Sequence, residues 1–170
     1  MKLTGIHFLL TYTCNYECDH CFLYCSPYTP GTFTIQQVEA VLQEAQKIGT
    51  IQTIYFEGGE PTLYYSLLLE SIRRAHQKGF EVGIVTNAYG ALAEEDALLW
   101  LRPLADLGAI STELLVEHVR LATQVRREMP FAQEYSEAVW AHYVLAPRVS
   151  QDFIWGRVKM VMNINGFSRS

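Results

Sequence analysis

The strongest constraint on the fold is a pattern that occurs three times in succession within residues 6–108. Each repeat begins with a short, largely apolar run, at 6–12, 51–57 and 80–87, as expected of strands that are buried on both faces. Apolar residues at helical spacing follow each run, and a glycine closes each segment: Gly49, Gly79 or Gly108. Three strand–helix units in a row predict an α/β fold with a parallel sheet and right-handed crossovers.

The ends of the predicted helices carry residues that suit helix termini. Thr34 and Gln37 form a capping-box pattern at the start of the first helix, which Gly49 ends. The second helix is expected over residues 64–78. The third is expected over 94–107, where three consecutive acids at its start favour the positive end of the helix dipole.

Composition indicates one ordinary globular core and argues against several classes of partner. The 170 residues are 49% hydrophobic and carry a net charge of −5, with no cluster of basic residues of the kind that binds nucleic acids. No segment approaches the roughly 20 apolar residues of a membrane span, and the N-terminal residues lack the pattern of a signal peptide. The sequence therefore predicts a cytoplasmic protein without membrane or nucleic-acid partners, in which thiols stay reduced.

All four cysteines lie in one short stretch, in the loop after the first predicted strand. Cys14, Cys18 and Cys21 are spaced C-x3-C-x2-C, and a disulfide, a structural zinc site and an iron–sulfur cluster compete as interpretations. Structural zinc normally takes four ligands in two separated pairs, and the chain has no second pair. A 4Fe–4S cluster accepts several cysteines from one loop, and three thiolates leave one iron with an open position for chemistry.

The fourth thiol, Cys25, leaves three interpretations open. It is a small, partly buried residue behind the loop, or it has a redox or substrate-side role, or it is a fourth ligand that closes the cluster. A closed cluster would only transfer electrons. Such a cluster does not explain the second loop with ligand-binding features that follows the next strand.

The loops after the second and third strands are also chemically unusual, and in a parallel sheet all three loops open at the same edge. "EGGEP" supplies Gly58 and Gly59, which allow close backbone approach to a ligand, and then the carboxylate of Glu60 and the rigid Pro61. The alternative interpretation is a glycine turn with an exposed acid. In "TNAYG", Asn87 offers amide groups to the same pocket, although asparagine also forms turns on its own account.

The cysteine spacing after the first strand, together with GGEP after the second, resembles the radical S-adenosylmethionine (radical SAM) superfamily over residues 6–108. The resemblance implies that Cys14, Cys18 and Cys21 hold a 4Fe–4S cluster whose open iron is chelated by the amino and carboxylate groups of SAM. It also implies a partial (βα) barrel. The implied reaction is reductive cleavage of SAM to a 5′-deoxyadenosyl radical, which abstracts hydrogen from a substrate. An external electron donor, such as a ferredoxin or flavodoxin, is then an expected partner.

The same resemblance assigns the other cofactor-binding residues. The GGEP loop contacts the SAM amino group in that family, which implies this role for Gly58, Gly59 and Glu60 and a loop-shaping role for Pro61. His20 stands where the family usually has an aromatic residue near the adenine, and Asn87 matches a position that often contacts SAM. Glu60 is expected to contribute little to the core, so Glu60→Gln is expected to lower SAM affinity and leave the melting temperature near wild type.

The resemblance stops at Gly108. We therefore expect a radical SAM half-barrel core over residues 1–108 and a mainly helical segment over 109–170 that is atypical of the family. Either the chain is a reduced or rearranged member whose helices cap a half barrel, or it is a fragment or frame-shifted form of a longer fold. An open edge of parallel strands invites pairing, and a homodimer or a partner protein is one way to cover it.

The C-terminal segment carries patterns of secondary structure but no motif. The predicted elements are a helix at 111–128 that Pro130 ends, a helix at 131–145 and a strand at 157–164. His118 and His142 occupy core-type helical positions, which favours ordinary packing over ligand binding. The substrate, a small molecule or a peptide, is therefore not identified. The alternative to a radical SAM enzyme is a non-catalytic iron–sulfur or zinc module derived from a truncated core.

Overall fold

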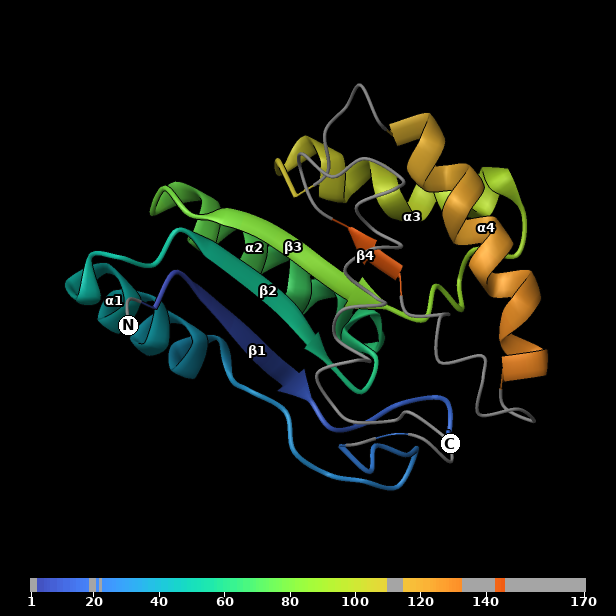
Figure 1. Ribbon diagram of the computed structural model, residues 1–170, viewed down its shortest axis with the longest axis horizontal. Coiled ribbons are helices and arrows are strands. Elements are labelled where there is room, and N and C mark those ends of the chain that lie inside the picture. Colours follow the sequence, from blue (N-terminus) through green and yellow to red (C-terminus); the bar gives the residue numbers. More distant parts are fainter. Residues whose placement is uncertain (1–2, 19–20, 22, 110–114, 133–142, 146–170) are drawn as a thin grey trace, which may run out of the picture.

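A computed structural model describes residues 3–18, 21, 23–109, 115–132 and 143–145. A four-stranded sheet runs through it in the order β1–β2–β3–β4 (Figure 1). The strands β1 (Gly5–Thr11), β2 (Thr53–Gly58) and β3 (Glu81–Thr86) are parallel, which confirms the predicted α/β class. Parallel neighbours place the ends of all three strands, and the loops that follow, at one edge of the sheet.

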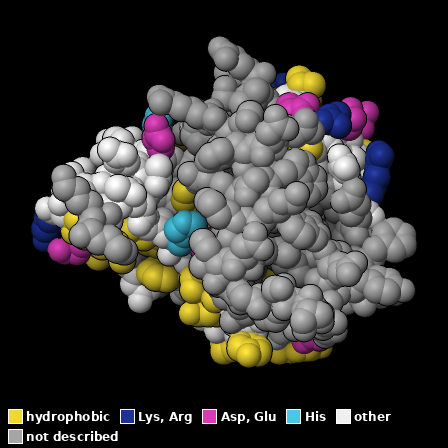
Figure 2. Space-filling model, in the orientation of Figure 1, with side chains coloured by type: hydrophobic (Ala, Val, Ile, Leu, Met, Phe, Trp, Pro, Cys, Tyr) yellow, Lys and Arg dark blue, Asp and Glu magenta, His cyan; other side chains and the backbone are white. Residues whose placement is uncertain are grey.

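The loop that follows β1 lies at the surface of the protein. Two of its tyrosines, Tyr24 and Tyr28, are each 86% exposed. Figure 2 shows hydrophobic side chains along the lower edge of the molecule, where Figure 1 places this loop. The part of the loop around these two tyrosines is therefore open to solvent, whereas Cys14 and Cys25 are buried.

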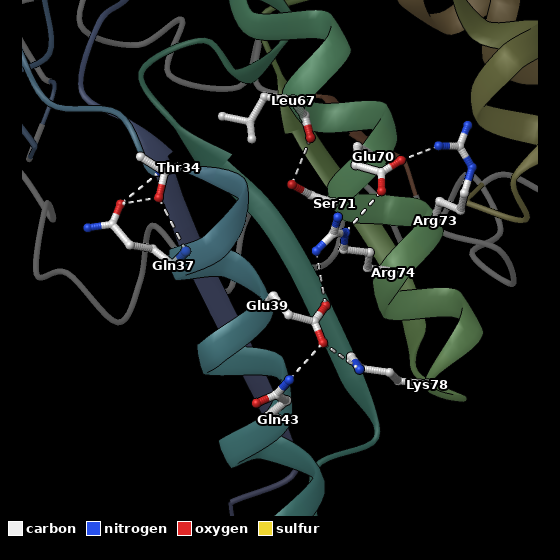
Figure 3. Close-up of polar contacts among 10 residues, drawn as sticks. All are labelled: Thr34, Gln37, Glu39, Gln43, Leu67, Glu70, Ser71, Arg73, Arg74 and Lys78. Atoms are coloured by element: carbon white, nitrogen blue, oxygen red, sulfur yellow. Dashed lines mark hydrogen bonds and ion pairs between the residues drawn. The ribbon is translucent and has the colours of Figure 1, made fainter.

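Helices α1 (Ile35–Ile48) and α2 (Tyr65–Gln77) lie side by side on one face of the sheet (Figure 3). The predicted capping box is present at the start of α1, and Gly49 ends that helix in the left-handed conformation. The core lies between these helices and the strands. Its fully buried side chains include Leu10, Phe56 and Ile84 from the sheet and Leu42, Leu68 and Ile72 from the helices.

A cluster of charges joins α1 to α2 across their outer surface. Glu39 of α1 lies 2.8 Å from the Lys78 ammonium and 3.5 Å from the Arg74 guanidinium (Figure 3). The hydrogen bond from Lys78 lowers the pKa of Glu39. A second pair, Glu44 with Lys47, lies within α1 and is much more exposed, at 66% and 71%.

We expect Glu39→Gln to lower the free energy of unfolding by a few tenths to about 1 kcal/mol, the usual range of partly exposed ion pairs. Because the pKa of Glu39 is lowered in the folded state, the stabilisation is present above the ordinary Glu pKa and is lost as the pH falls through the folded value. Urea unfolding at pH 7 and below about pH 4 checks both points. The control is Glu44→Gln. An equal loss of unfolding free energy in that variant would contradict a specific stabilising role for Glu39.

Helices α3 (Glu94–Asp106) and α4 (Leu115–Ala132) pack against each other. In Figure 1, α4 stands beyond the carboxyl ends of the parallel strands. His118 of α4 is 1% exposed, which confirms its predicted core position, and burial lowers its pKa to about 4. Among the described residues, none of the helices combines the length and apolar character that crossing a membrane requires.

The C-terminal segment differs from the sequence prediction. Tyr143–Leu145 form β4, which pairs antiparallel with the end of β3, where the sequence predicts part of a helix over 131–145. The pairing satisfies backbone groups that the edge of β3 would otherwise leave open, and this tertiary gain outweighs helical periodicity. The helix α4 also continues past Pro130, because a proline removes one hydrogen bond but need not end a helix held by packing. The predicted strand at 157–164 and His142 lie outside the described residues.

The antiparallel β4 also bears on the predicted half barrel. In the described part of the chain, three strands are parallel, and β4 occupies the edge of β3 where a fourth parallel strand would extend a barrel. The arrangement is consistent with a partial radical SAM-type sheet. A barrel is not seen in these residues.

Candidate cofactor site

Backbone hydrogen bonds along the outer edge of β1 close the base of the cysteine loop. The amide of Tyr12 donates to the carbonyl of Gly31 at 2.8 Å, and the amide of Phe33 donates to that of Leu10 at 2.9 Å. Further along, the amide of Cys14 donates to the carbonyl of Ser26 at 3.0 Å. These hydrogen bonds fix where the loop leaves the sheet and where it returns, and they hold the backbone of Cys14 in a defined position.

Two of the three predicted cluster ligands already accept backbone hydrogen bonds at sulfur. The amide of Tyr16 lies 3.4 Å from Cys14 Sγ, and the amide of Cys25 lies 3.3 Å from Cys21 Sγ. Burial raises the pKa of the Cys14 thiol to about 11. Within the residues that the structure describes, no three ligating side chains gather closely enough to hold a metal ion, so convergence of Cys14, Cys18 and Cys21 stays a prediction.

Cys25 is buried behind the loop, as the first of its three interpretations expects. It is 5% exposed, and burial together with the neighbouring Cys21 raises its pKa to about 12. Tyr24, just before it, adopts a positive φ of 53°, an uncommon conformation for a bulky residue. This turn directs the Cys25 amide at Cys21, so the fourth cysteine supports the loop from inside.

The two glycines of the GGEP loop are required by close packing against the end of β1. A side-chain carbon at Gly58, whose φ is +133°, would lie 2.2 Å from the carbonyl oxygen of Thr11. At Gly59 it would lie 2.2 Å from the carbonyl oxygen of Thr13. The same carbonyls accept hydrogen bonds from the amides of Gly59 and Glu60, at 2.7 and 3.0 Å. The loop after β2 is thus docked directly onto the start of the cysteine loop.

The expectation that Glu60 contributes little to the core is wrong. Its side chain is fully buried, and one carboxylate oxygen accepts from the amide and hydroxyl of Thr62 at 3.0 and 2.5 Å. That oxygen also accepts from the Thr86 hydroxyl at 2.8 Å, and the other accepts from the Asn87 amide at 2.7 Å. Burial raises the pKa of Glu60, and these four hydrogen bonds oppose that effect. Glu60 therefore fastens the loop after β2 to the end of β3.

Asn87 connects the loop after β3 to the cysteine loop. Its side-chain amide donates to Asn15 Oδ1 at 2.9 Å and lies 3.8 Å from Cys14 Sγ. Its own oxygen accepts from the amide of Tyr89 at 3.0 Å. At 2% exposure, Asn87 is held on both sides, and the three loops form one connected unit.

The structure brings Cys14, Glu60 and Asn87 together with several residues that the sequence did not single out: Asn15, Thr62, Thr86 and Tyr89. One signal for Thr62 was present. Proline is common at the first position of a helical turn, and the buried Pro61 starts the 3-10 turn η1 (Pro61–Tyr64), for which the Glu60 side chain caps the Thr62 amide. The partners from other loops carry no such local signal. His20, predicted to lie near the adenine, falls outside the described residues.

Comparison with known proteins agrees with this arrangement. The sequence model of the Radical SAM superfamily matches residues 8–137. A tungsten-containing aldehyde ferredoxin oxidoreductase cofactor-modifying protein of Pyrococcus furiosus is 32% identical over 100 residues, which is 58% of this chain and 26% of that protein.

Two further relatives are named S-adenosylmethionine-dependent nucleotide dehydratases. The one from Selenomonas ruminantium is 30% identical over 78 residues, 46% of this chain and 27% of its own. The one from a Fibrobacter species is 28% identical over 93 residues, 51% of this chain and 28% of its own. The matched part thus spans about a quarter of the length of each of these relatives. Because the family model covers more than half of the chain, including all three loops of the site, this chain belongs to the radical SAM superfamily.

Proposed function

We propose that this chain binds a 4Fe–4S cluster through Cys14, Cys18 and Cys21 and uses it with SAM in a radical reaction. The observation that carries the proposal is the superfamily match over residues 8–137, which contains both the cysteine loop and the GGEP loop. Their direct docking at one sheet edge supports it, because the two cofactors would have to meet there. The whole reaction, including its substrate, belongs to the proposal, since the relatives carry different names for their activities.

The donor set of the cysteine loop fits an iron–sulfur cluster. Thiolates are the ligands of such clusters, and hydrogen bonds to the sulfurs are a general means of setting their potential. Cys14 and Cys21 accept such bonds from the amides of Tyr16 and Cys25. A cluster held by Cys14, Cys18 and Cys21 alone keeps one open iron, and the proposal gives Cys25 a supporting role through its amide contact with Cys21 Sγ.

A 4Fe–4S cluster held by Cys14, Cys18 and Cys21 would supply the chemistry, which is one-electron reduction of SAM to methionine and a 5′-deoxyadenosyl radical with an electron taken from an external donor. The residues of the chain would position these groups. The backbone of Gly58 and Gly59 lines the position where the loops after β1 and β2 meet, and Asn87 faces Cys14 from the third loop. Glu60 acts on SAM binding by holding these loops together. An external one-electron donor, such as a ferredoxin or flavodoxin, completes the proposed system.

The iron content of cysteine variants should distinguish the three predicted cluster ligands from Cys25. Anaerobic reconstitution of the wild type should give about four irons and four sulfides per chain. Cys14→Ala, Cys18→Ala and Cys21→Ala should each lose most of the iron, because one thiolate of three is removed. Cys25→Ala should keep it. Iron and sulfide analysis checks this, and loss of iron in all four variants would favour a closed four-cysteine cluster.

Binding of SAM distinguishes the enzyme from the alternative module. For the enzyme, SAM should change the EPR spectrum of the reduced cluster, and 5′-deoxyadenosine should form when a reductant is added. A cluster whose spectrum is insensitive to SAM would favour a non-catalytic iron–sulfur module. One zinc and no iron after anaerobic preparation would favour a zinc module instead.

A further inference from the structure

Arg126 connects the C-terminal helix α4 to the candidate site. Its Nε–H donates to the carbonyl oxygen of Tyr89 at 3.0 Å, across 37 positions in the sequence. The side chain is only partly exposed. Charged donors make hydrogen bonds that are stronger than those between neutral groups, and partial burial strengthens them further. The contact therefore ties α4 firmly to the loop after β3.

A short series of hydrogen bonds leads from this contact to the cysteine loop. The amide of Tyr89, the residue whose carbonyl Arg126 holds, donates to Asn87 Oδ1 at 3.0 Å. Asn87 in turn donates to Asn15 at 2.9 Å. Movement of Tyr89 would change the orientation of the Asn87 amide group, and with it the contact beside Cys14.

The loop between Asn87 and Tyr89 contains a strained residue that surrounding contacts hold in place. Ala88 is fully buried and has a positive φ of 54°, which is unfavourable for a residue with a Cβ atom. Such conformations persist only where surrounding contacts hold them. The Ala88 amide is held by the Thr86 hydroxyl at 3.1 Å and its carbonyl by the Ala91 amide at 2.9 Å. The Arg126 bond adds a restraint from outside the loop at the very next residue.

We propose that Arg126 is a positioning residue, which fixes the loop after β3 from helix α4 and thereby holds Asn87 against the cysteine loop. The effect of Arg126 on SAM binding rests on the proposed function, whereas the effect of Arg126 on the loop after β3 does not. Helix α4, which lies within the residues that the superfamily model matches, then contributes directly to the site that the first three strand–helix units build.

The test compares Arg126→Met with Arg126→Lys and with the neighbouring Arg127→Met in the full chain. Arg127 is exposed on the same helix and is the matched control. Amide hydrogen exchange of residues 87–91, measured without cofactors, should become about tenfold to a hundredfold faster in Arg126→Met, since one charge-assisted restraint is lost. Arg127→Met should exchange like the wild type. Arg126→Lys keeps a charged donor and should restore most of the protection.

The second measurement is the dissociation constant of SAM after cluster reconstitution. Arg126→Met should weaken binding by about tenfold, with Arg126→Lys between it and the wild type. Equal exchange in Arg126→Met and Arg127→Met would overturn the proposal, as would faster exchange throughout the sheet without rescue by lysine. If Arg126→Met does not fold, wild-type exchange in Arg126→Lys is required for the proposal to stand. A wild type that binds no SAM refutes the proposed function, and the exchange result still decides the role of Arg126.

Discussion

Gly58→Ala should lower the free energy of unfolding by roughly 3–5 kcal/mol, the combined cost of backbone strain and overpacking. The φ of +133° is unfavourable for alanine, and the added carbon would lie 2.2 Å from the Thr11 carbonyl oxygen. That carbonyl cannot move away easily, because it also accepts the Gly59 amide at 2.7 Å. Gly59→Ala meets the same obstacle at Thr13 and should be destabilising by overpacking alone.

Urea unfolding without cofactors measures this effect on the chain itself. The matched control is Gly90→Ala in the loop after β3, where an added carbon would have no neighbouring atom of the described residues within 4 Å. That variant should be neutral or up to about 1 kcal/mol more stable, because alanine reduces the entropy of the unfolded chain. Equal stability of Gly58→Ala and Gly90→Ala would show that the loop after β2 is not docked on β1 as described.

Glu60→Gln should be destabilised by about 2–4 kcal/mol, in contrast to the near-wild-type stability that the sequence suggests. The substitution places an NH2 group where a carboxylate oxygen accepts a backbone N–H, most severely at the Asn87 amide, 2.7 Å away. If the amide flips, the NH2 group meets the Thr62 amide instead, at 3.0 Å. Either way one buried donor loses its partner, which costs about 1–3 kcal/mol, with more for a charged acceptor.

Thermal and urea unfolding of the cofactor-free protein measure this loss, with Glu44→Gln on the exposed surface of α1 as the control. Because Glu60 fastens the loop after β2 to β3, SAM affinity of the reconstituted variant should fall as well. If Glu60→Gln lowers the SAM affinity and leaves the melting temperature unchanged, Glu60 has a direct ligand-binding role. If the SAM affinity and the melting temperature are both unchanged, Glu60 has neither the ligand-binding role nor the structural role.

The sequence by itself determined the elements of residues 5–106 and their type. Apolar runs of strand length and helical spacing between glycines are local patterns, and each predicted unit is present, down to the capping box of Thr34 and Gln37. The same local reasoning failed in the C-terminal segment. Residues Tyr143–Leu145 pair with β3 because a neighbouring strand offers hydrogen bonds there, and periodicity within the segment cannot report such a neighbour.

The sequence also determined which three loops make up the candidate site, because parallel strands bring their carboxyl ends to one edge. Only the tertiary structure decided what the residues of those loops do. The carboxylate of Glu60 turns inward because donors from Thr86 and Asn87, some 26 positions away, are close enough to compensate for burial. Arg126 contacts Tyr89 because helix α4 packs close to the loop after β3, and no sequence motif predicts that packing. Hydrogen bonds of this kind depend on distances between segments remote in sequence, and such distances are fixed only when the sheet and its helices have packed.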